Sequence, residues 1–337
     1  MKSFKNILVV RTDRIGDVVL TSPAFKELRG AFPYAKITAL VVPSTKELVE
    51  GNPNIDQVLV DDRKNDHKGI LGFWRLVSIL REKRFDCAII FHTKRRANAL
   101  CFLAGIPYRA GYRNNKWGFL LTDPAADRRH EGIKHESQYC LDVVRHLGVT
   151  VGSGELFLPL QKGSEEWAEH WLKEQKILLL SDKLIAIHPG ASGPEKQWVK
   201  SGFAQVIQHL TDKYSAKVVL IGAPEIQPVA REIQMLAQRP VWDLTGKTTI
   251  GQLTSLLKRC KFLVSNDSGP VHVADAVGTP VISIFTRNQP GINSVRWRPL
   301  SGRGRVLSPA LQKAGAPPEN VPVQDVLEAV DALFKLC

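Results

Sequence analysis

Short and almost uninterrupted apolar runs recur along the whole chain, and each is followed by a turn and then by a helical pattern. A strand that is apolar at every position must be buried on both faces, which is typical of a parallel sheet with helices on both sides. The sequence therefore predicts an α/β fold. The strands are expected at 7–10, 37–42, 58–60, 87–91 and 108–112 in the first half, and at 184–188, 217–222, 262–267 and 281–285 in the second.

Helical patterns fill the intervals between these runs. The pattern is clearest near 201–213, where Phe203, Ile207 and Leu210 share one face. Ser201 is the expected N-cap of that helix. The other helices are expected near 17–30, 43–50, 70–83, 94–104, 137–147, 224–237, 249–259 and 270–277.

The 337 residues are more than a single hydrophobic core usually holds. The rhythm of strands and helices stops at a polar stretch, about 149–182, and then restarts. We therefore predict two Rossmann-like, doubly wound parallel-sheet domains, 1–165 and 166–320, that face a central cleft. A last amphipathic helix within 321–337 is expected to pack back on the N-terminal domain.

The chain carries a formal charge of +13, from 46 lysines and arginines and 33 aspartates and glutamates. The first 150 residues contribute +9, since they hold 25 basic and 16 acidic side chains. Nucleic acid, an acidic membrane surface or a phosphorylated substrate would each match this charge, and so would a surface that only confers solubility. No apolar run reaches the ~18 residues that cross a bilayer, and the start has no signal-peptide pattern, so a cytoplasmic location is expected.

Several familiar cofactor and catalytic motifs are missing from the sequence. The first strand is followed by a single glycine, Gly16, where a dinucleotide fold needs GxGxxG, so nicotinamide chemistry is disfavoured. Gly246-Lys247-Thr248 ends like a P-loop, but Val241 stands where that loop requires glycine. The chain also lacks the GxSxG, HExxH and DxD motifs that carry a nucleophile or a metal ion. No cofactor and no metal ion are expected.

Two side chains at predicted strand ends are candidates for catalysis. Asp17 follows the tight turn after the first strand, where it is either an N-cap aspartate or a general base that faces the cleft. Lys196 lies in a loop of small residues and prolines after the strand at 184–188. There it is either a solvated lysine or the point charge of an anion clamp. The residues alone leave both alternatives open.

A third strand end carries Ser268 and Gly269 just before Pro270, which fits the first turn of a helix. Their backbone amides would face a diphosphate at the positive end of the helix dipole, unless the segment serves only as a helix cap. Basic residues also follow several strands in the first half of the chain. They form either an anion-binding site or an ordinary solvated surface. The helix near 70–83 is flanked by cations and is either a membrane-surface helix or a core helix.

The order and spacing of these segments resemble one known family. The segments are 11–23 (RTDRIGDVVLTSP), 188–198 (HPG to KQW) and 266–272 (NDSGPVH), together with 109–113, 135–148 and 243–246. This set, in register over about 1–290, resembles glycosyltransferase family 9, the ADP-heptose:lipopolysaccharide heptosyltransferases. The resemblance implies a GT-B fold with the acceptor bound in the N-terminal domain and the nucleotide sugar in the C-terminal one. It also implies inversion at the anomeric carbon without a metal ion. The stretch 286–320 matches no part of the pattern.

The resemblance also implies a role for individual residues. Asp17 would deprotonate the acceptor hydroxyl, and Lys196 would neutralise charge on the departing diphosphate. The implied donor-binding residues are His188, Gly190, Lys196 and Trp198, Glu225 near the ribose, Thr248 near the adenine, Asp267 at the sugar, Ser268 and Gly269 at the phosphates, and His272. The expected acceptor-binding residues are Arg11, Arg14, Lys94, Arg95, Arg96, Arg109 and Arg113.

The resulting hypothesis is a monomeric glycosyltransferase on the cytoplasmic side of the inner membrane, attached peripherally. It would move a heptose or related sugar from an ADP-sugar to an anionic, lipid-linked saccharide in the inner-core (Kdo) region of lipopolysaccharide. One alternative is another GT-B enzyme, such as an epimerase, a hydrolase or a transferase with a different donor. A nucleic-acid-binding protein is disfavoured, because aromatic residues are only 7% of the chain and do not interleave with the basic clusters.

Overall fold

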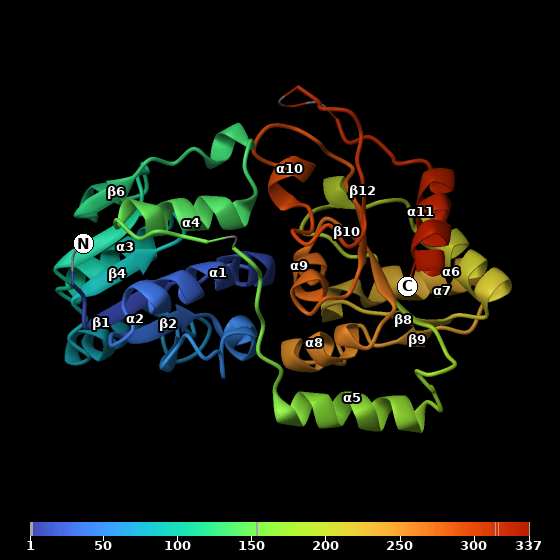
Figure 1. Ribbon diagram of the computed structural model, residues 1–337, viewed down its shortest axis with the longest axis horizontal. Helices are drawn as coiled ribbons and strands as arrows, with labels where there is room; N and C mark the ends of the chain where they lie inside the picture. The colour runs from blue at the N-terminus through green and yellow to red at the C-terminus, as the bar shows by residue number, and fades with distance from the viewer. Residues whose placement is uncertain (1–2, 153, 314, 316, 337) are drawn as a thin grey trace. The chain divides into compact units, whose positions relative to one another are not determined.

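The computed structural model describes residues 3–152, 154–313, 315 and 317–336, and the chain divides into two compact units (Figure 1). The first unit comprises Met1–His130 and Glu136–Pro159, and the second comprises Glu131–His135 and Leu160–Cys337. The main division therefore falls within the polar stretch that the sequence marks as a boundary, a few residues before the expected 165.

The first unit contains a sheet of six parallel strands in the order β3-β2-β1-β4-β5-β6. The strands are β1 (Asn6–Val10), β2 (Lys36–Val41), β3 (Gln57–Val60), β4 (Cys87–Ile90), β5 (Tyr108–Tyr112) and β6 (Asp123–Ala125). The helices are α1 (Ile15–Ala31), α2 (Gly69–Glu82), α3 (Arg95–Leu103) and α4 (Glu136–His146), with 3-10 turns η1 (Pro43–Leu48), η2 (Gly118–Leu120) and η3 (Arg129–Glu131).

The central strands of this sheet are buried because they are apolar on both faces. Leu8 and Val10 of β1 pack in one core with Leu76 and Leu80 of α2 and with residues of α3. Side chains alternate along a strand, so Ile7 and Val9, which are also fully buried, face the opposite side. Helix α1 packs against α4, and α2 packs against α3. Helices thus cover both faces, as uninterrupted apolar strands require.

The second unit contains a sheet of six parallel strands in the order β12-β11-β10-β7-β8-β9. Counted from its own first strand, this is the strand order of the first unit, so both sheets have the doubly wound Rossmann arrangement. The strands are β7 (Leu184–His188), β8 (Lys217–Leu220), β9 (Trp242–Asp243), β10 (Phe262–Asn266), β11 (Val281–Ile284) and β12 (Arg305–Leu307). The helices are α5 (Lys162–Glu174), α6 (Lys200–Tyr214), α7 (Gln227–Ala237), α8 (Ile250–Lys258), α9 (Gly269–Ala276), α10 (Ser294–Trp297) and α11 (Val323–Leu336), with 3-10 turns η4 (Pro194–Lys196) and η5 (Pro224–Ile226).

Every strand that the apolar runs predict is present in the structure. The short strands β6, β9 and β12 lie at sheet edges and are not predicted, because two or three residues cannot form a recognisable run. Helix α5 lies inside the polar stretch and buries only Ala168, Trp171 and Leu172 of its side chains. None of the described helices is both long enough and apolar enough to span a membrane.

One local expectation is wrong. Helix α6 begins at Lys200 with Val199 as N-cap, so Ser201 lies inside the first turn. The Val199 carbonyl already accepts hydrogen bonds from the amides of Gly202 and Phe203, at 3.0 and 3.4 Å. Helix α11 packs within the second unit: Val326, Val330 and Leu333 are buried in the core of that unit, and the helix contacts α6, β11 and β12. Its expected packing on the N-terminal domain stays a prediction. Cys337, the last residue of the predicted segment, lies outside the described residues.

Candidate active site

The strand order of each sheet indicates where a ligand would bind. In a doubly wound sheet, the crevice lies outside the carboxyl ends of the two central strands, where the strand order reverses. These strands are β1 and β4 in the first unit and β7 and β10 in the second. The segments that follow these strands carry Asp17, Lys196, Asp267 and Ser268, four of the side chains that the sequence singles out.

Asp17 is not an N-cap. Helix α1 begins at Ile15, its N-cap is Arg14, and no side chain caps it. Asp17 lies in the first turn with its side chain 17% exposed, and Oδ1 accepts a hydrogen bond of 2.7 Å from Nη2 of Arg11. Its backbone carbonyl accepts a hydrogen bond from Thr21 Oγ1 at 2.8 Å. The carboxylate therefore retains solvent access while an arginine fixes its orientation.

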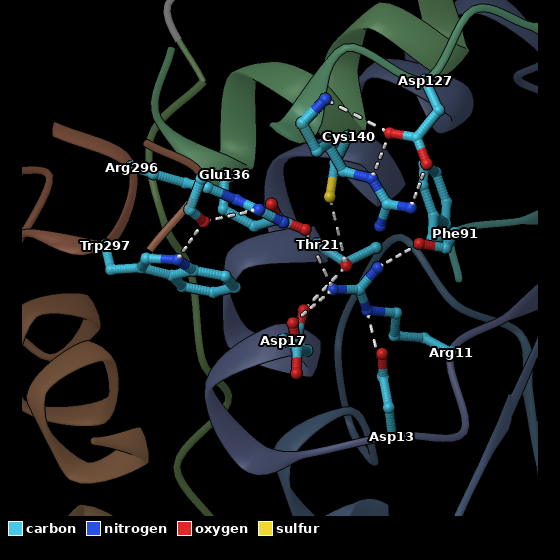
Figure 2. A network of polar contacts seen from close by, with 12 residues as sticks. Arg11, Asp13, Asp17, Thr21, Phe91, Asp127, Glu136, Cys140, Arg296 and Trp297 are labelled. Atoms are coloured by element: carbon cyan, nitrogen blue, oxygen red, sulfur yellow. Dashed lines mark hydrogen bonds and ion pairs between the residues drawn. The ribbon is translucent and has the colours of Figure 1, made fainter. Parts of the chain in front are cut away.

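Arg11 is the centre of a buried charge network (Figure 2). Its side chain is only 1% exposed, and Nη1 donates to the carbonyl of Phe91 at the end of β4. Its nitrogens also lie 3.1 Å from Asp13 Oδ1 and 3.3 Å from Glu136 Oε1. The three carboxylates hold the pKa of Arg11 above its ordinary value although burial alone would lower it. The expected contact between Arg11 and the acceptor is therefore wrong: Arg11 is enclosed by protein groups and positions Asp17.

Two carboxylates of this network, Asp13 and Glu136, carry no pattern in the sequence that predicts a role in the site. Burial raises the pKa of Asp13 to about 6, because the nearby Arg11 compensates only part of the desolvation. Glu136 is fully buried at the start of α4. A glutamate at a helix start reads as an ordinary surface residue, and its partner Arg11 is 125 positions away, so no local pattern could reveal the pair.

The other arginines and lysines expected at the acceptor separate into two groups. Arg14, Lys94, Arg95 and Arg113 are exposed at or just beyond the carboxyl ends of strands, where the acceptor was expected. Arg96 instead forms a bidentate ion pair with the buried Asp61, with nitrogen–oxygen distances of 2.9 and 2.8 Å.

Arg109 lies near the amino end of β5, at the edge of the sheet opposite the candidate site. Its guanidinium donates to the carbonyl of Leu120, at 2.7 Å, and to that of Ile106, and it lies over the ring of Phe102. Arg109 therefore links the loops before and after β5 at the amino end of the sheet. This position does not support the expectation that Arg109 binds the acceptor.

In the second unit, His188 and Ser268 meet behind the carboxyl ends of β7 and β10. Ser268 Oγ lies 3.0 Å from Nδ1 of His188, and Ser265 Oγ lies 3.3 Å from the same nitrogen. Both hydroxyls also donate to the carbonyl of Asn266, at 3.0 and 2.7 Å, which favours a neutral imidazole with its proton on Nδ1. Burial lowers the pKa of His188 to about 4, consistent with that neutral form.

Helix α9 opens directly at this point. Ser268 is its N-cap in an extended conformation, and Pro270 occupies the first turn. Within the described residues, the amides of Ser268 and Gly269 have no protein acceptor, so they remain available to an anion at the positive end of the helix dipole. This position confirms the expected geometry of the segment; the ligand itself stays a prediction.

Asn266, a polar residue at the end of a buried strand, was given no role in the sequence analysis. Its Oδ1 accepts from the amide of Trp198 at 3.0 Å, and its Nδ2 donates to the carbonyl of Pro189 at 2.7 Å. It therefore ties both ends of the loop that carries Lys196. Gly190 lets the backbone of this loop pack closely against Ile226, because a Cβ at position 190 would lie 2.8 Å from the Ile226 side chain.

Lys196 is ion-paired rather than free. Its Nζ contacts Oδ2 of Asp267, and the two side chains are 18% and 9% exposed. The neighbouring Glu195 lies 3.3 Å from Nη1 of Arg287, a residue of the stretch after β11 to which the sequence analysis assigned no role. Cations and carboxylates therefore alternate beside the N-terminus of α9, and a bound anion would compete with Asp267 for Lys196.

Trp198 is a core residue rather than a donor-binding residue. It is 2% exposed, its ring packs edge-on against Phe203 at 5.0 Å between centroids, and its Nε1 donates to the carbonyl of Val321 at 2.8 Å. The expectation that Trp198 contacts the donor is therefore wrong. Its bulk anchors the loop of Lys196 to the core of the second unit.

The remaining residues expected to bind the donor lie at or near the carboxyl ends of the strands of the second sheet. Glu225 is exposed in η5, directly after β8, and Thr248 is half-buried in the turn before α8. His272 is buried in α9, where desolvation lowers its pKa to about 3. Within the described ranges, no His, Cys, Asp and Glu side chains gather in groups of three or more that could hold a metal ion.

Comparison with known proteins identifies the family. The model of glycosyltransferase family 9 (heptosyltransferase) matches residues 73–318, and the chain belongs to this family. It is 25% identical over 333 residues to lipopolysaccharide core heptosyltransferase OpsX of Haemophilus influenzae, covering 94% of this chain and 89% of the relative.

Two solved structures have the same fold. The family 9 glycosyltransferase of Veillonella parvula superposes with a TM-score of 0.86 at 25% identity, covering 99% and 98% of the two chains. The ADP-heptose lps heptosyltransferase II of Escherichia coli superposes with a TM-score of 0.79 at 23% identity, covering 98% and 99%. The predicted GT-B fold class is therefore confirmed, and the protein is a glycosyltransferase.

Three buried neutral histidines predict how stability depends on pH. Burial lowers the pKa of His92 and His272 to about 3 and that of His188 to about 4. Between pH 6.5 and 4, these three histidines are therefore protonated in the unfolded chain but neutral in the folded protein. Asp13 acts in the opposite sense, because its raised pKa of about 6 lets the folded state bind one proton more readily. The free energy of unfolding should therefore fall as the pH is lowered toward 5, with a net uptake of about two protons on unfolding.

Urea unfolding at several pH values measures this proton uptake. His188→Gln should lower the proton uptake on unfolding by about one, because glutamine binds no proton in either the folded or the unfolded state. His170→Gln is the matched control, since His170 is exposed on α5. Equal slopes in the two variants would contradict a buried neutral His188.

Proposed function

We propose that this enzyme transfers a heptose, with inversion and without a metal ion, from an ADP-sugar to an anionic inner-core (Kdo) saccharide of lipopolysaccharide. The observation that carries this proposal is the group of hydrogen-bond donors that follows the central strands of the second sheet. Lys196 and the amides of Ser268 and Gly269 gather there at the positive end of α9. Fixed positive charge of this kind stabilises the charge that develops on a leaving diphosphate.

In the proposed reaction, Asp17 acts as the general base. Its carboxylate takes the proton of the acceptor hydroxyl while the hydroxyl oxygen attacks the anomeric carbon of the donor. The bond between that carbon and the diphosphate oxygen breaks, and the leaving electron pair stays on the diphosphate. Lys196 and the two amides stabilise that charge, so the step needs one carboxylate and one anion site.

The proposed donor contacts follow from the resemblance to the family. Glu225 would accept from the ribose hydroxyls, Thr248 would line the adenine pocket, and Asp267 would contact the sugar once a diphosphate draws Lys196 away. His188 and Gly190 support this region: the imidazole binds the Ser268 hydroxyl, and the glycine gives the loop space. The acceptor would be held by the exposed cations Arg14, Lys94, Arg95 and Arg113.

The names of the relatives support the donor and the acceptor. One relative is called a lipopolysaccharide core heptosyltransferase, and one structural neighbour is called an ADP-heptose lps heptosyltransferase. By extension, we propose that this enzyme works as a monomer in the cytoplasm at the surface of the inner membrane, in the pathway that builds the cell envelope.

A transfer assay tests the proposed function. The purified protein is mixed with ADP-heptose and a Kdo-containing lipid acceptor, and the product is followed by mass spectrometry. A mass increase of one heptose on the acceptor, undiminished after EDTA treatment, is expected. Consumption of the donor at the same rate without acceptor would instead favour a hydrolase or an epimerase, and a requirement for divalent ions would contradict the metal-free mechanism.

Lys196→Gln is expected to weaken the binding of ADP by roughly 1–3 kcal/mol, which is about 5- to 150-fold in Kd. The variant removes the cation and leaves the Asp267 carboxylate facing the diphosphate. Lys200→Gln is the matched control, because Lys200 is also paired, with Glu232 at 2.5 Å, but lies on α6. Titration calorimetry that finds equal ADP affinity in both variants would remove Lys196 from the donor site.

A further inference from the structure

Large apolar side chains are exposed on the first two turns of α2. Ile70 is 78% exposed, Leu71 is 84% exposed and Trp74 is 47% exposed. Their spacing places them together on one side of the helix, whereas Leu76 and Leu80 pack into the core. Helix α2 therefore has a second apolar area that nothing in the first unit covers.

A second exposed apolar group lies between β5 and β6. Trp117 is 44% exposed and Phe119 is 80% exposed. Trp117 has a left-handed backbone (φ 65°), which is unfavourable for a bulky residue and must be held by its surroundings. Asn98 of α3 holds the preceding residue by donating to the carbonyl of Lys116 at 3.1 Å. Both α2 and η2 pack against α3, so the two apolar groups flank one helix.

Exposed cations lie in the loops at the carboxyl ends of the strands next to α2 and Trp117. The loops that follow the carboxyl ends of β3, β4 and β5, in the described ranges 61–68, 91–95 and 113–117, contain one exposed carboxylate, Asp66. The exposed cations of these loops are Lys64, Lys68, Lys94, Arg95, Arg113 and Lys116. The edge therefore combines aromatic and aliphatic side chains with a strong excess of positive charge.

We propose that this area, formed by Ile70, Leu71, Trp74 and Trp117 with the six exposed cations of these loops, docks on an anionic lipid bilayer. We call it the docking surface. Tryptophan is favoured at the level of lipid headgroups, apolar side chains enter the acyl boundary, and lysine and arginine attract anionic lipids. A protein partner fits less well, because protein interfaces are depleted in lysine and four of the six cations are lysines.

The position of the docking surface suits the proposed acceptor, and the inference rests on the proposed function in this respect. Helix α2 starts at the carboxyl edge of the sheet, and Trp74 lies only about 8 Å along the helix axis from that start. Asp17 lies at the same edge, after β1. A lipid-anchored saccharide could therefore present its hydroxyl to Asp17 while its lipid remains in the bilayer.

Vesicle co-sedimentation tests the docking surface without requiring activity. Wild-type protein should bind vesicles of phosphatidylglycerol and phosphatidylethanolamine and should bind pure phosphatidylcholine vesicles much more weakly. The double variant Ile70→Ser/Leu71→Ser should lower the partition coefficient on the anionic vesicles by at least about tenfold, because two exposed side chains no longer leave water. Lys64→Gln/Lys68→Gln should lower it as well and should weaken its salt dependence.

The matched control is Leu178→Ser/Leu180→Ser, which removes two leucines of the second unit that are also largely exposed. Equal binding of the control and of Ile70→Ser/Leu71→Ser would overturn the proposal. So would a wild-type dimer in light scattering that Ile70→Ser/Leu71→Ser makes monomeric, since the area would then be an interface between two copies. A delipidated, soluble acceptor distinguishes the docking proposal from the proposed function. Ile70→Ser/Leu71→Ser should transfer heptose to this acceptor as well as the wild type does. A wild-type protein that binds vesicles but transfers no heptose would contradict only the proposed function.

Discussion

Asp17→Asn is expected to lower kcat by at least about 100-fold, which is the usual contribution of a general base. The amide keeps the size of the side chain but cannot take the proton of the acceptor hydroxyl. Its oxygen can still accept the 2.7 Å hydrogen bond from Arg11, so the local structure should persist. Single-turnover assays at saturating donor and acceptor measure the loss, and titration calorimetry should find ADP affinity unchanged.

The matched control for this prediction is Asp13→Asn. Asp13 also contacts Arg11, at 3.1 Å, but its carboxyl is more deeply buried and its pKa is raised to about 6. We expect a loss of less than about tenfold for Asp13→Asn, because this residue orients Arg11 and does not accept the proton. Turnover close to wild type in Asp17→Asn, or a larger loss in Asp13→Asn, would identify a different base.

The sheets could be predicted from the sequence because buried parallel strands leave a pattern in short segments. Each apolar run that ends in a polar loop marks the carboxyl end of a strand, and Asp17, Lys196 and Ser268 were found in this way. The fine structure of the site depends on residues distant in the sequence. Nothing near Lys196 indicates its pairing with Asp267, which is 71 positions further along the chain.

The same limit explains the basic residues whose expected role was wrong. The sequence shows how many arginines the chain has but not which of them form ion pairs with buried carboxylates. Arg11 and Arg96 neutralise buried carboxylates, whereas Arg14 and Arg95 remain exposed. Trp198 was expected at the donor because it stands beside Lys196, yet its ring fills the core of the second unit. Adjacent residues in a loop often point in opposite directions, and only the fold decides which of them meets a ligand.

The buried network around Arg11 predicts the largest effect on stability. Arg11→Met is expected to lower the free energy of unfolding by about 3–5 kcal/mol, because it leaves the buried Glu136 and the partly buried Asp13 and Asp17 without their shared cation. Urea denaturation at pH 7 measures the loss. Arg63→Met is the matched control: Arg63 also contacts a buried carboxylate, Asp61 at 2.9 Å, but is itself 34% exposed. It should cost less, about 1 kcal/mol, because Arg63 is only half-buried and Arg96 still neutralises Asp61.

A second variant distinguishes lost charge compensation from lost packing. If the loss of the Arg11 cation beside the buried Glu136 causes the destabilisation, Arg11→Met/Glu136→Gln should recover part of it, because a neutral amide costs less to bury than a carboxylate. If the loss reflects packing alone, the second substitution should add its own cost to that of the first. The double variant should still turn over slowly, because Asp17 would have lost the guanidinium that orients it, and a return of stability without a return of kcat is the expected result.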